Sequence, residues 1–368
     1  MTAPAGNPPR IWLLLGDKVG DNRQVERIAE ALGEPFQIHR LVFEPRWRQG
    51  KPPFLPALYH VDQGASDALG PPWPDLILTI GRRPAMAALW IRRRSRNRTR
   101  LVLFGRPKRY FSDFDLIVTP VQYRMPEHAR VLQLGLPLIR LDEARIAAEA
   151  DAWQERLAAM PRPLTVLLVG GKTKPFDMDA SVARELLART LESMPAGGGL
   201  FVSTSRRTPT VVVDTLRDRL PEGAKLHAFE PGAAENPYLA LLGLGDRFVV
   251  TGDSVSMLTE IARLGRPLQI YPLPEAPSIG RRLLLRAERS AALAGGLGLL
   301  RRWGLAGWPR DLTALHDLLV RQGRAVRLGE DVARVPASAS ASASASVPPE
   351  DELTRVVGRV REVLNGEG

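Results

Sequence analysis

Short apolar runs followed by glycine turns and amphipathic segments recur along the chain. The clearest example starts with the apolar run at residues 248–251, continues through Asp253 and Ser254, and reaches a second apolar run at residues 268–271. The apolar residues between the two runs recur with a helical period, and Asp or Ser before such a period is typical of a helix N-cap. The stretch therefore predicts a βαβ unit of a parallel sheet.

In parallel α/β sheets, ligands bind at the carboxyl ends of the strands, where free N–H groups at a helix start favour an anion. Glu260 lies on the predicted helix, where its carboxylate could hold the two hydroxyls of a sugar. An ordinary βαβ unit with a surface glutamate has the same pattern. Both interpretations stay open at this point.

The same order of strand, glycine turn and helix occurs in both halves of the chain. Strands are predicted at residues 11–15, 36–43, 75–80, 101–104 and 115–119, and again at 164–169, 200–203, 225–230, 248–251 and 268–271. The helix after the first strand is predicted to end at Gly33. A connecting helix is predicted at residues 142–160, and Pro161-Arg162-Pro163 marks a domain boundary. The pattern predicts an α/β protein with a Rossmann-like domain at residues 10–160 and a second one at residues 161–334.

The two ends of the chain have different patterns. Residues 1–9 are rich in Pro and Gly and are predicted to be disordered. Residues 335–349 contain a pure Ala/Ser alternation, which is typical of a flexible linker. Residues 350–368 form an amphipathic helix that is expected to dock on the body of the protein, with one side made by Leu353, Val356, Val357, Val360 and Leu364.

Composition adds a charge to this picture. The 368 residues include 51 Lys and Arg against 40 Asp and Glu, for a net charge of +11. Such an excess favours an anionic partner, either a phosphorylated ligand or an anionic membrane surface, although a compositionally biased genome would have the same effect. The run Arg92–Arg98 could touch anionic lipid. No nucleic-acid module signature is found, so nucleic acid is not an expected partner.

Cysteine is absent, which excludes a disulfide framework and thiolate metal ligands. The first residues contain no apolar stretch of signal-peptide length. The protein is therefore expected in the cytoplasm, and peripheral contact with the inner membrane is the alternative location.

Three turns carry groups suited to phosphate. Gly170, Gly171 and Lys172 follow one predicted strand, although Val166 stands where a P-loop needs its first glycine. Ser205, Arg206 and Arg207 follow another strand, where hydroxyls and guanidinium groups fit phosphate oxygens. In the first half, Gly81-Arg82-Arg83-Pro84 suits a further anion-accepting helix start.

Two Asp-x-Asp motifs raise the question of a metal ion. Asp177 and Asp179 are better explained by a helix cap, and Asp115, in the motif with Asp113, opens a predicted strand. No metal and no cofactor are expected.

Several motifs together are familiar. GDKVGDNRQVERIAEALG, PDLILTIGRR, VGGKTKPFDMD, STSRRTP, ENPYLALL and TGDSVSMLTEIARLGRP, which span about residues 10–275, resemble the mitochondrial fission family of plant elongated-mitochondria proteins and their bacterial relatives. This family is similar to glycosyltransferases of the GT-B architecture, which have two facing Rossmann-like domains with a cleft between them. The segment around Glu260 resembles that of the lipid-linked peptidoglycan N-acetylglucosaminyltransferase.

The resemblance implies roles for individual residues. Glu260 would hold the ribose of a nucleotide, and the loop of Gly16, Gly20 and Asn22 would face the acceptor. The nucleotide and phosphate set implied in this way is Gly170, Gly171, Lys172, Ser205, Arg206, Arg207, Asn236, Tyr238, Gly252, Asp253, Ser254, Ser256, Met257 and Glu260.

The leading hypothesis is an inverting, metal-independent glycosyltransferase that uses a nucleotide-diphosphate sugar. Lys172, Arg206 and the helix start at Asp253 would neutralise the leaving diphosphate. Asp17 or Asp21 in the first glycine loop is the candidate general base. The acceptor is not identified by the sequence, and a lipid-linked one is an option. The alternative is a non-catalytic GT-B-like protein that recruits partners at membranes.

Overall fold

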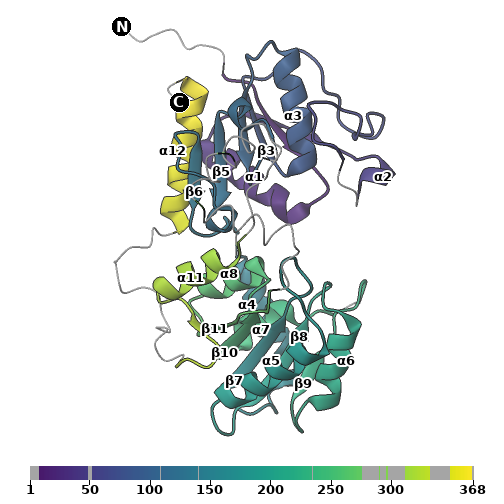
Figure 1. Cartoon of the computed structure of the whole chain (residues 1–368), viewed down its shortest axis with the longest axis vertical. Coiled ribbons are helices and arrows are strands. Elements are labelled where there is room, and N and C mark those ends of the chain that lie inside the picture. The colour runs from purple at the N-terminus through teal and green to yellow at the C-terminus, as the bar shows by residue number, and fades with distance from the viewer. Residues whose placement is uncertain are drawn as a thin grey trace. The chain divides into compact units, whose positions relative to one another are not determined.

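The computed structural model describes residues 8–48, 52–107, 109–139, 141–233, 235–275, 290, 296, 311–331 and 349–366. These residues form two compact units. The first unit contains the described residues up to Leu138, with Asp311 and the C-terminal helix, and the second contains residues 139–275 and 312–331. Each unit is built on one six-stranded sheet (Figure 1).

The first sheet is entirely parallel. Its strands, in spatial order, are β2 (Phe36–Arg40), β1 (Ile11–Leu15), β3 (Leu76–Ile80), β4 (Arg100–Phe104), β5 (Leu116–Pro120) and β6 (Val131–Leu134). Four helices of this unit lie wholly within the described residues: α1 (Val19–Leu32), α2 (Pro45–Arg48), α3 (Arg82–Arg94) and α12 (Pro349–Asn365). Short 3-10 turns lie at Phe111–Asp113 and Val121–Tyr123.

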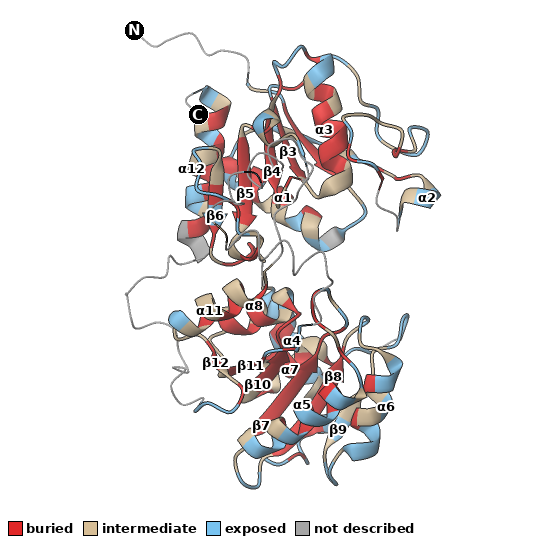
Figure 2. Ribbon diagram, viewed as in Figure 1, coloured by how far each residue is buried: buried red, intermediate tan, exposed pale blue. Residues whose placement is uncertain are grey.

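Successive side chains of a strand point to opposite faces of its sheet. Those of β1 are apolar on both faces, so both faces of this sheet must be covered. Leu13 packs in a cluster with residues of α1 and α12. Its neighbours Trp12 and Leu14 pack in the opposite cluster with residues of α3. Figure 2 shows the central strands as buried and the outer sides of the helices as exposed.

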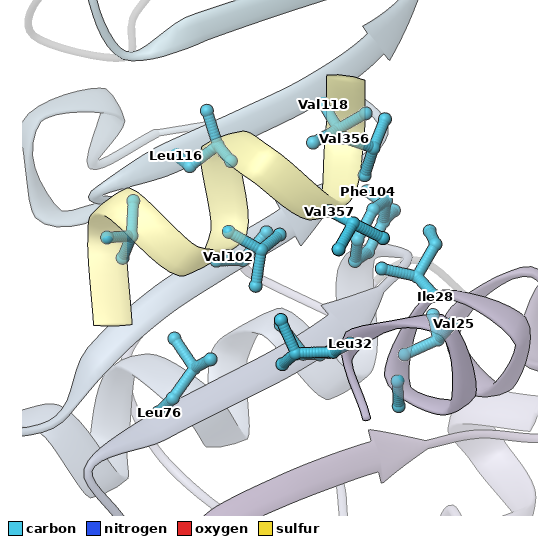
Figure 3. Packing of buried hydrophobic residues seen from close by; sticks show 14 of the residues in the cluster. Val25, Ile28, Leu32, Leu76, Val102, Phe104, Leu116, Val118, Val356 and Val357 are labelled. Atoms are coloured by element: carbon cyan, nitrogen blue, oxygen red, sulfur yellow. The ribbon is translucent and has the colours of Figure 1, made fainter. Parts of the chain in front are cut away.

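The C-terminal helix α12 completes the first core. Val356 and Val357 pack against Val25 and Ile28 of α1 and against the sheet (Figure 3). Polar contacts fix the helix as well, because the buried Glu352 accepts a hydrogen bond of 2.8 Å from the Gly135 N–H. The helix is therefore a structural part of the first unit.

The second sheet is also parallel. Its strands, in spatial order, are β12 (Val326–Arg327), β11 (Leu268–Tyr271), β10 (Arg247–Thr251), β7 (Leu164–Val169), β8 (Gly199–Thr204) and β9 (Lys225–His227). The helices of this unit are α4 (Glu143–Leu157), α5 (Ala180–Ser193), α6 (Thr210–Arg219), α7 (Tyr238–Leu244), α8 (Val255–Arg263) and α11 (Thr313–Arg321).

Each strand predicted from the sequence is present, but two of them end early. The strand predicted at residues 225–230 ends at His227. The strand predicted at residues 36–43 ends at Arg40, because the chain then leaves the sheet and Phe43 forms an antiparallel bridge with Val61. Strands β6 and β12 were not predicted from the apolar pattern, since β6 alternates with exposed Gln133 and β12 has only two residues.

Some helix ends follow the predicted capping chemistry. Gly33 ends α1 with φ of 77°, a left-handed conformation that glycine adopts readily. Asp179 caps α5 by accepting hydrogen bonds from the Ser181 and Val182 N–H groups. Both ends agree with the signals in the sequence.

Several predictions concern residues outside the described part of the chain. These are the disorder predicted for residues 1–7, the linker predicted at residues 335–348, the helix predicted at residues 281–293 except Ser290, which is not helical, and the predicted basic and aromatic patch of Arg301, Arg302, Trp303 and Trp308. Within the described residues, the helices are too short or too polar to cross a membrane.

The docking of α12 generates a stability prediction. Val360 has no exposed surface, so Val360→Ala should lower the free energy of unfolding by about 2 kcal/mol through lost burial and a residual cavity. Urea unfolding of the full chain measures the change. The matched control is Val211→Ala on α6, where the valine is 51% exposed and the effect should stay within about 0.5 kcal/mol. Equal effects at the two positions would show that α12 does not belong to the folding unit.

Candidate functional site

Both sheets have a topological switch point, where the loops after two neighbouring strands diverge. In the first sheet this point lies between β1 and β3, and in the second sheet it lies between β7 and β10. Ligands of open α/β sheets bind at such points, outside the carboxyl ends of the strands. The candidate residues follow these strands in both units, and each unit is described separately.

Asp253 joins the loops of the second unit. Its side chain is fully buried after β10 and accepts hydrogen bonds from the Gly171 N–H at 2.9 Å and from the Thr251 hydroxyl at 2.8 Å. The guanidinium group of Arg207, after β8, lies 3.2 Å from the same carboxylate. Burial raises the pKa of the Asp253 carboxyl, whereas these partners oppose the shift. Asp253 therefore acts as an internal anion that connects three loops.

The glycines after β7 are explained by this close packing. A Cβ added to Gly170 would lie 2.2 Å from a carboxylate oxygen of Asp253, and one added to Gly171 would lie 2.0 Å from the Arg207 carbonyl oxygen. Neither approach leaves room for a side chain. The Gly171 N–H, which the sequence assigns to phosphate, already donates to Asp253.

The basic side chains at this edge differ in how they are paired. Lys172 forms an ion pair of 2.8 Å with Asp177, and Arg207 is paired with Asp253. Arg206 is exposed, and no partner of its guanidinium group is found among the described residues. Arg206 is thus the predicted phosphate ligand whose charge is available without breaking a contact.

Glu260 lies beside Tyr238, as the sequence motifs suggested for a shared site. Both side chains are partly buried, and the Tyr238 hydroxyl donates a short hydrogen bond to the Glu260 carboxylate. Burial raises the pKa of Glu260, and the hydrogen bond from Tyr238 opposes the shift. Burial, together with the Glu260 charge, raises the pKa of Tyr238 well above its usual value. Within the described chain, Tyr238 is the one hydrogen-bond partner of the carboxylate.

The start of α8 differs from the prediction in one respect. Ser254 occupies the N-cap position, but its side chain makes no capping hydrogen bond, and Asp253 binds the loop after β7 instead. Neither residue therefore caps the helix through its side chain, because the buried carboxylate is used to join the loops. Ser256 is exposed and Met257 partly exposed in the first turn.

Three further residues of the predicted nucleotide set have local roles. The side-chain oxygen of Asn236 accepts from the Tyr238 N–H at 3.0 Å and so orients the start of α7. The Gly252 carbonyl oxygen lies 2.7 Å from Nε2 of the buried His316 on α11. Ser205 forms a turn in which its N–H donates to the Thr208 hydroxyl at 2.9 Å.

The first unit has a pocket of about 300 Å³ at its switch point. It contains the loop after β1 and the start of α3, and its lining residues are Gly16, Asp17, Lys18, Asp21, Asn22, Arg48, Ile80, Gly81, Arg82, Arg83 and Pro84. The predicted acceptor-loop residues Gly16 and Asn22 and both candidate bases therefore meet in one pocket. Gly20 is exposed and does not line it.

The two candidate bases are held differently. The Arg83 guanidinium donates to both carboxylate oxygens of Asp17 at 2.9 Å. Among the described residues, the charged partner of Asp21 is Lys18 alone, at 3.7 Å, and that lysine is largely exposed. Asp21 is therefore the carboxylate with more freedom to accept a proton from a bound hydroxyl.

The aspartates of the Asp-x-Asp motifs have structural partners. Asp177 is paired with Lys172, Asp179 caps α5, and Asp115 is paired with Arg92. In the part of the chain that the structure describes, no group of three His, Asp or Glu side chains is placed to hold a metal ion.

Sequence analysis missed some of the residues that hold the site together. Thr251 and Thr208 link neighbouring loops through their hydroxyls, and His316 comes from a helix with no site motif. Arg48, at the end of α2, lines the first pocket. Thr251 at the end of β10 and Thr208 in the turn after β8 were usable signals, whereas the roles of His316 and Arg48 depend on tertiary packing.

Comparison with known proteins now adds a family. The model of the family described as mitochondrial fission ELM1 matches residues 19–286, well over half of the chain. The chain belongs to the mitochondrial fission ELM1 family. The resemblance identified from the motifs is thereby confirmed.

Two relatives represent this ELM1 family. Mitochondrial fission protein ELM1 of Arabidopsis thaliana is 28% identical over 220 residues, which covers 54% of this chain and 51% of that protein. The chain thus spans about half the length of this relative. Protein RP120 of Rickettsia prowazekii (strain Madrid E) is 24% identical over 313 residues, which covers 75% of this chain and 86% of that protein.

Solved structures support the fold class. The co-structure of S. aureus MnaA with UDP has a TM-score of 0.50 and 11% identity, and covers 97% of both chains. UDP-GlcNAc 2-epimerase from Neisseria meningitidis, bound to UDP-GlcNAc, has a TM-score of 0.50 and 10% identity, and covers 96% of this chain and 100% of that chain. At such identities the likeness shows the fold, and the predicted GT-B-like α/β class is confirmed.

The environment of Glu260 predicts a pH-dependent stability of this ELM1-family chain. Because the folded-state pKa of Glu260 is raised, ionisation disfavours the folded state. The wild type should therefore lose stability as the pH rises from the ordinary glutamate pKa through the raised one. Glu260→Gln keeps an acceptor for Tyr238 and cannot ionise, so its stability relative to the wild type should increase across this window.

Unfolding free energies of both proteins, measured from acidic to neutral pH, test this point. Glu192→Gln replaces an exposed glutamate and serves as the control. A constant difference between Glu260→Gln and the wild type across the whole pH range contradicts the prediction.

Proposed function

We propose that this chain binds a nucleotide-diphosphate sugar in the second unit and transfers the sugar to an acceptor, with inversion and without a metal ion. The observation that carries the proposal is the half-buried carboxylate of Glu260, held by Tyr238 at the carboxyl edge of the second sheet. When a phenol donates to one oxygen of a carboxylate, the other oxygen can accept a hydrogen bond from a ribose hydroxyl. Its position near a switch point suits a nucleotide.

The charges of the neighbouring loops support the diphosphate half of the proposal. Arg206 is exposed after β8, and Lys172 and Arg207 lie in the loops after β7 and β8. Guanidinium and ammonium groups can stabilise a leaving diphosphate in place of a metal ion. Lys172 would exchange its ion pair with Asp177 for the ligand.

The fold comparisons are consistent with this donor class. The MnaA structure contains UDP, and the N. meningitidis epimerase contains UDP-GlcNAc. Uridine diphosphate is therefore the first nucleotide to test with this chain. These neighbours do not bear on whether the sugar is transferred.

The proposed reaction is a displacement at C1 of the sugar. The acceptor hydroxyl oxygen forms a bond to C1 of the sugar from the side opposite the diphosphate. The bond between C1 and the diphosphate oxygen breaks, and its electron pair leaves with the diphosphate. The hydroxyl proton passes to a carboxylate of the first unit, for which Asp21 is the better candidate because Asp17 is paired with Arg83.

A second function is favoured by a separate surface feature. Arg93, Arg94, Arg96 and Arg98 are exposed at the end of α3, and none has a carboxylate partner among the described residues. Such a run is suited to an anionic membrane surface. The alternative proposal is therefore a GT-B-like binding protein that recruits partners at the cytoplasmic face of a membrane without catalysis.

The ribose contact of Glu260 can be tested by binding. Hydrogen bonds to a charged group contribute about 1.5–3 kcal/mol, so Glu260→Gln should weaken UDP binding about 10- to 100-fold. Tyr238→Phe removes the neighbouring hydroxyl but keeps the carboxylate, so it should weaken UDP binding less than Glu260→Gln does. Calorimetric titration of UDP and 2′-deoxy-UDP into each protein measures this. If the wild type binds both nucleotides equally, Glu260 is not a ribose ligand.

Turnover separates the two functions. With a panel of UDP-sugars, a membrane extract as acceptor source and a chelator present, saturable release of UDP that requires the acceptor is expected. Asp21→Asn should lower the rate about 100- to 10,000-fold, as for loss of a general base. Asp214→Asn, at an exposed position on α6, is the control and should be fully active. Tight UDP binding with no acceptor-dependent release supports the non-catalytic alternative.

A further inference from the structure

The pocket of the first unit contains more positive than negative charge. Two of its ion pairs are internally balanced, Arg83 with Asp17 and Lys18 with Asp21. Arg48 and Arg82 also line the pocket, and neither has a carboxylate partner among the described residues. The lining therefore carries an excess of two positive charges over its carboxylates.

Arg82 is the more unusual of these two cations because it is partly buried. One of its terminal nitrogens donates to the Pro52 carbonyl oxygen, and its guanidinium group lies 5.7 Å from the centre of the Phe54 ring. Its Nε atom is buried and has no hydrogen-bond partner in the described structure. Burial is the main reason that the pKa of the Arg82 guanidinium is lowered, and the nearby Arg109 acts in the same direction. A buried cation with unmet hydrogen-bonding capacity favours an anionic ligand.

Arg83 holds the surrounding groups in place. Its guanidinium group donates to the Trp47 and Arg48 carbonyl oxygens at 2.7 and 2.8 Å, and it lies 4.3 Å from the centre of the Phe43 ring. The His60 Nε2 atom lies 2.8 Å from the Arg83 carbonyl oxygen. These contacts fix α2, and with it Arg48, beside the start of α3. The arrangement of the cations is thus determined by the protein itself.

The opposite side of the pocket offers acceptors. Asn22 is almost completely buried, and its side-chain nitrogen donates to the Gly16 carbonyl oxygen at 2.8 Å. Its side-chain oxygen has no partner among the described residues. With the carboxylate of Asp21 next to it in the loop, this side is suited to hydroxyl groups of a ligand.

We propose that the pocket of the first unit binds a phosphate-bearing, hydroxylated acceptor, with the phosphate on Arg82 and Arg48 and a hydroxyl toward Asp21 and Asn22. The inference rests on the proposed function, because it names the class of the acceptor. A volume of about 300 Å³ suffices for one sugar and its phosphate. The phosphate can belong to a soluble sugar phosphate or to a lipid-linked phosphate.

Binding to the full chain tests the proposal, with excess UDP present to occupy the second unit. Glucose 1-phosphate is the soluble probe and glucose its uncharged comparison. Vesicles of phosphatidylcholine with a polyprenyl phosphate are the lipid probe, and vesicles without it are their comparison. At least one phosphate probe should bind, and Arg82→Gln should weaken it about 10- to 100-fold. The probe that binds identifies the source of the phosphate.

Three variants make the result specific. Arg48→Gln changes an exposed side chain, so this variant should fold even if Arg82→Gln does not. It should also weaken binding of the phosphate probe. Arg219→Gln replaces an exposed arginine on α6 that does not line the pocket, and it should have no effect on binding of either probe. Arg206→Gln, in the second unit, should weaken UDP binding but leave the affinity for the phosphate probe unchanged.

The outcomes separate this inference from the proposed function. The inference is wrong if neither phosphate probe binds, or if Arg82→Gln and Arg48→Gln both leave the affinity for the probe unchanged. This holds whether or not UDP binds. If UDP fails to bind while an Arg82-dependent phosphate probe binds, the proposed donor is wrong and the phosphate site stands.

Discussion

Parallel pairing of the strands is the constraint on which the rest of this structure depends. Both six-stranded sheets are entirely parallel, so every connection crosses a face of the sheet and the central strands need apolar residues on both sides. The carboxyl ends of the strands in each sheet then meet at one edge. Polar side chains that lie far apart in sequence are gathered there by topology alone, as with Asp17 and Arg83 or Asp253 and Arg207.

These two ion pairs have the same structural role, because each joins two loops that follow separate strands. Loops after separate strands must hold a fixed arrangement around an open site, and a carboxylate from one loop bound by an arginine from another provides it. The two pairs differ in burial, since the Asp253 side chain is fully buried and Asp17 is 46% exposed. The second unit therefore uses its carboxylate mainly to hold the loops, whereas the first unit leaves carboxylates and cations open to its pocket.

Sequence reasoning identified what depends on local pattern and missed what depends on packing. The apolar runs located the long strands, and Gly33 and Asp179 marked helix ends correctly. The two-residue strand β12 has too short a pattern to detect. The motifs placed Glu260 and Tyr238 in one set, and the structure brings the two side chains together. The use of Asp253 to join loops followed from burial and three-dimensional proximity, which the N-cap signal could not reveal.

Two candidate ligand groups, Glu260 and Arg82, have charged forms that burial disfavours. Neither has an opposite charge beside it among the described residues. A sequence under selection for stability alone would replace such groups with neutral ones. Groups of this kind persist where a ligand supplies the missing partner, and perturbed ionisable groups are concentrated at functional sites for that reason. The hydroxyls of a ribose would meet this need at Glu260, and a phosphate would meet it at Arg82.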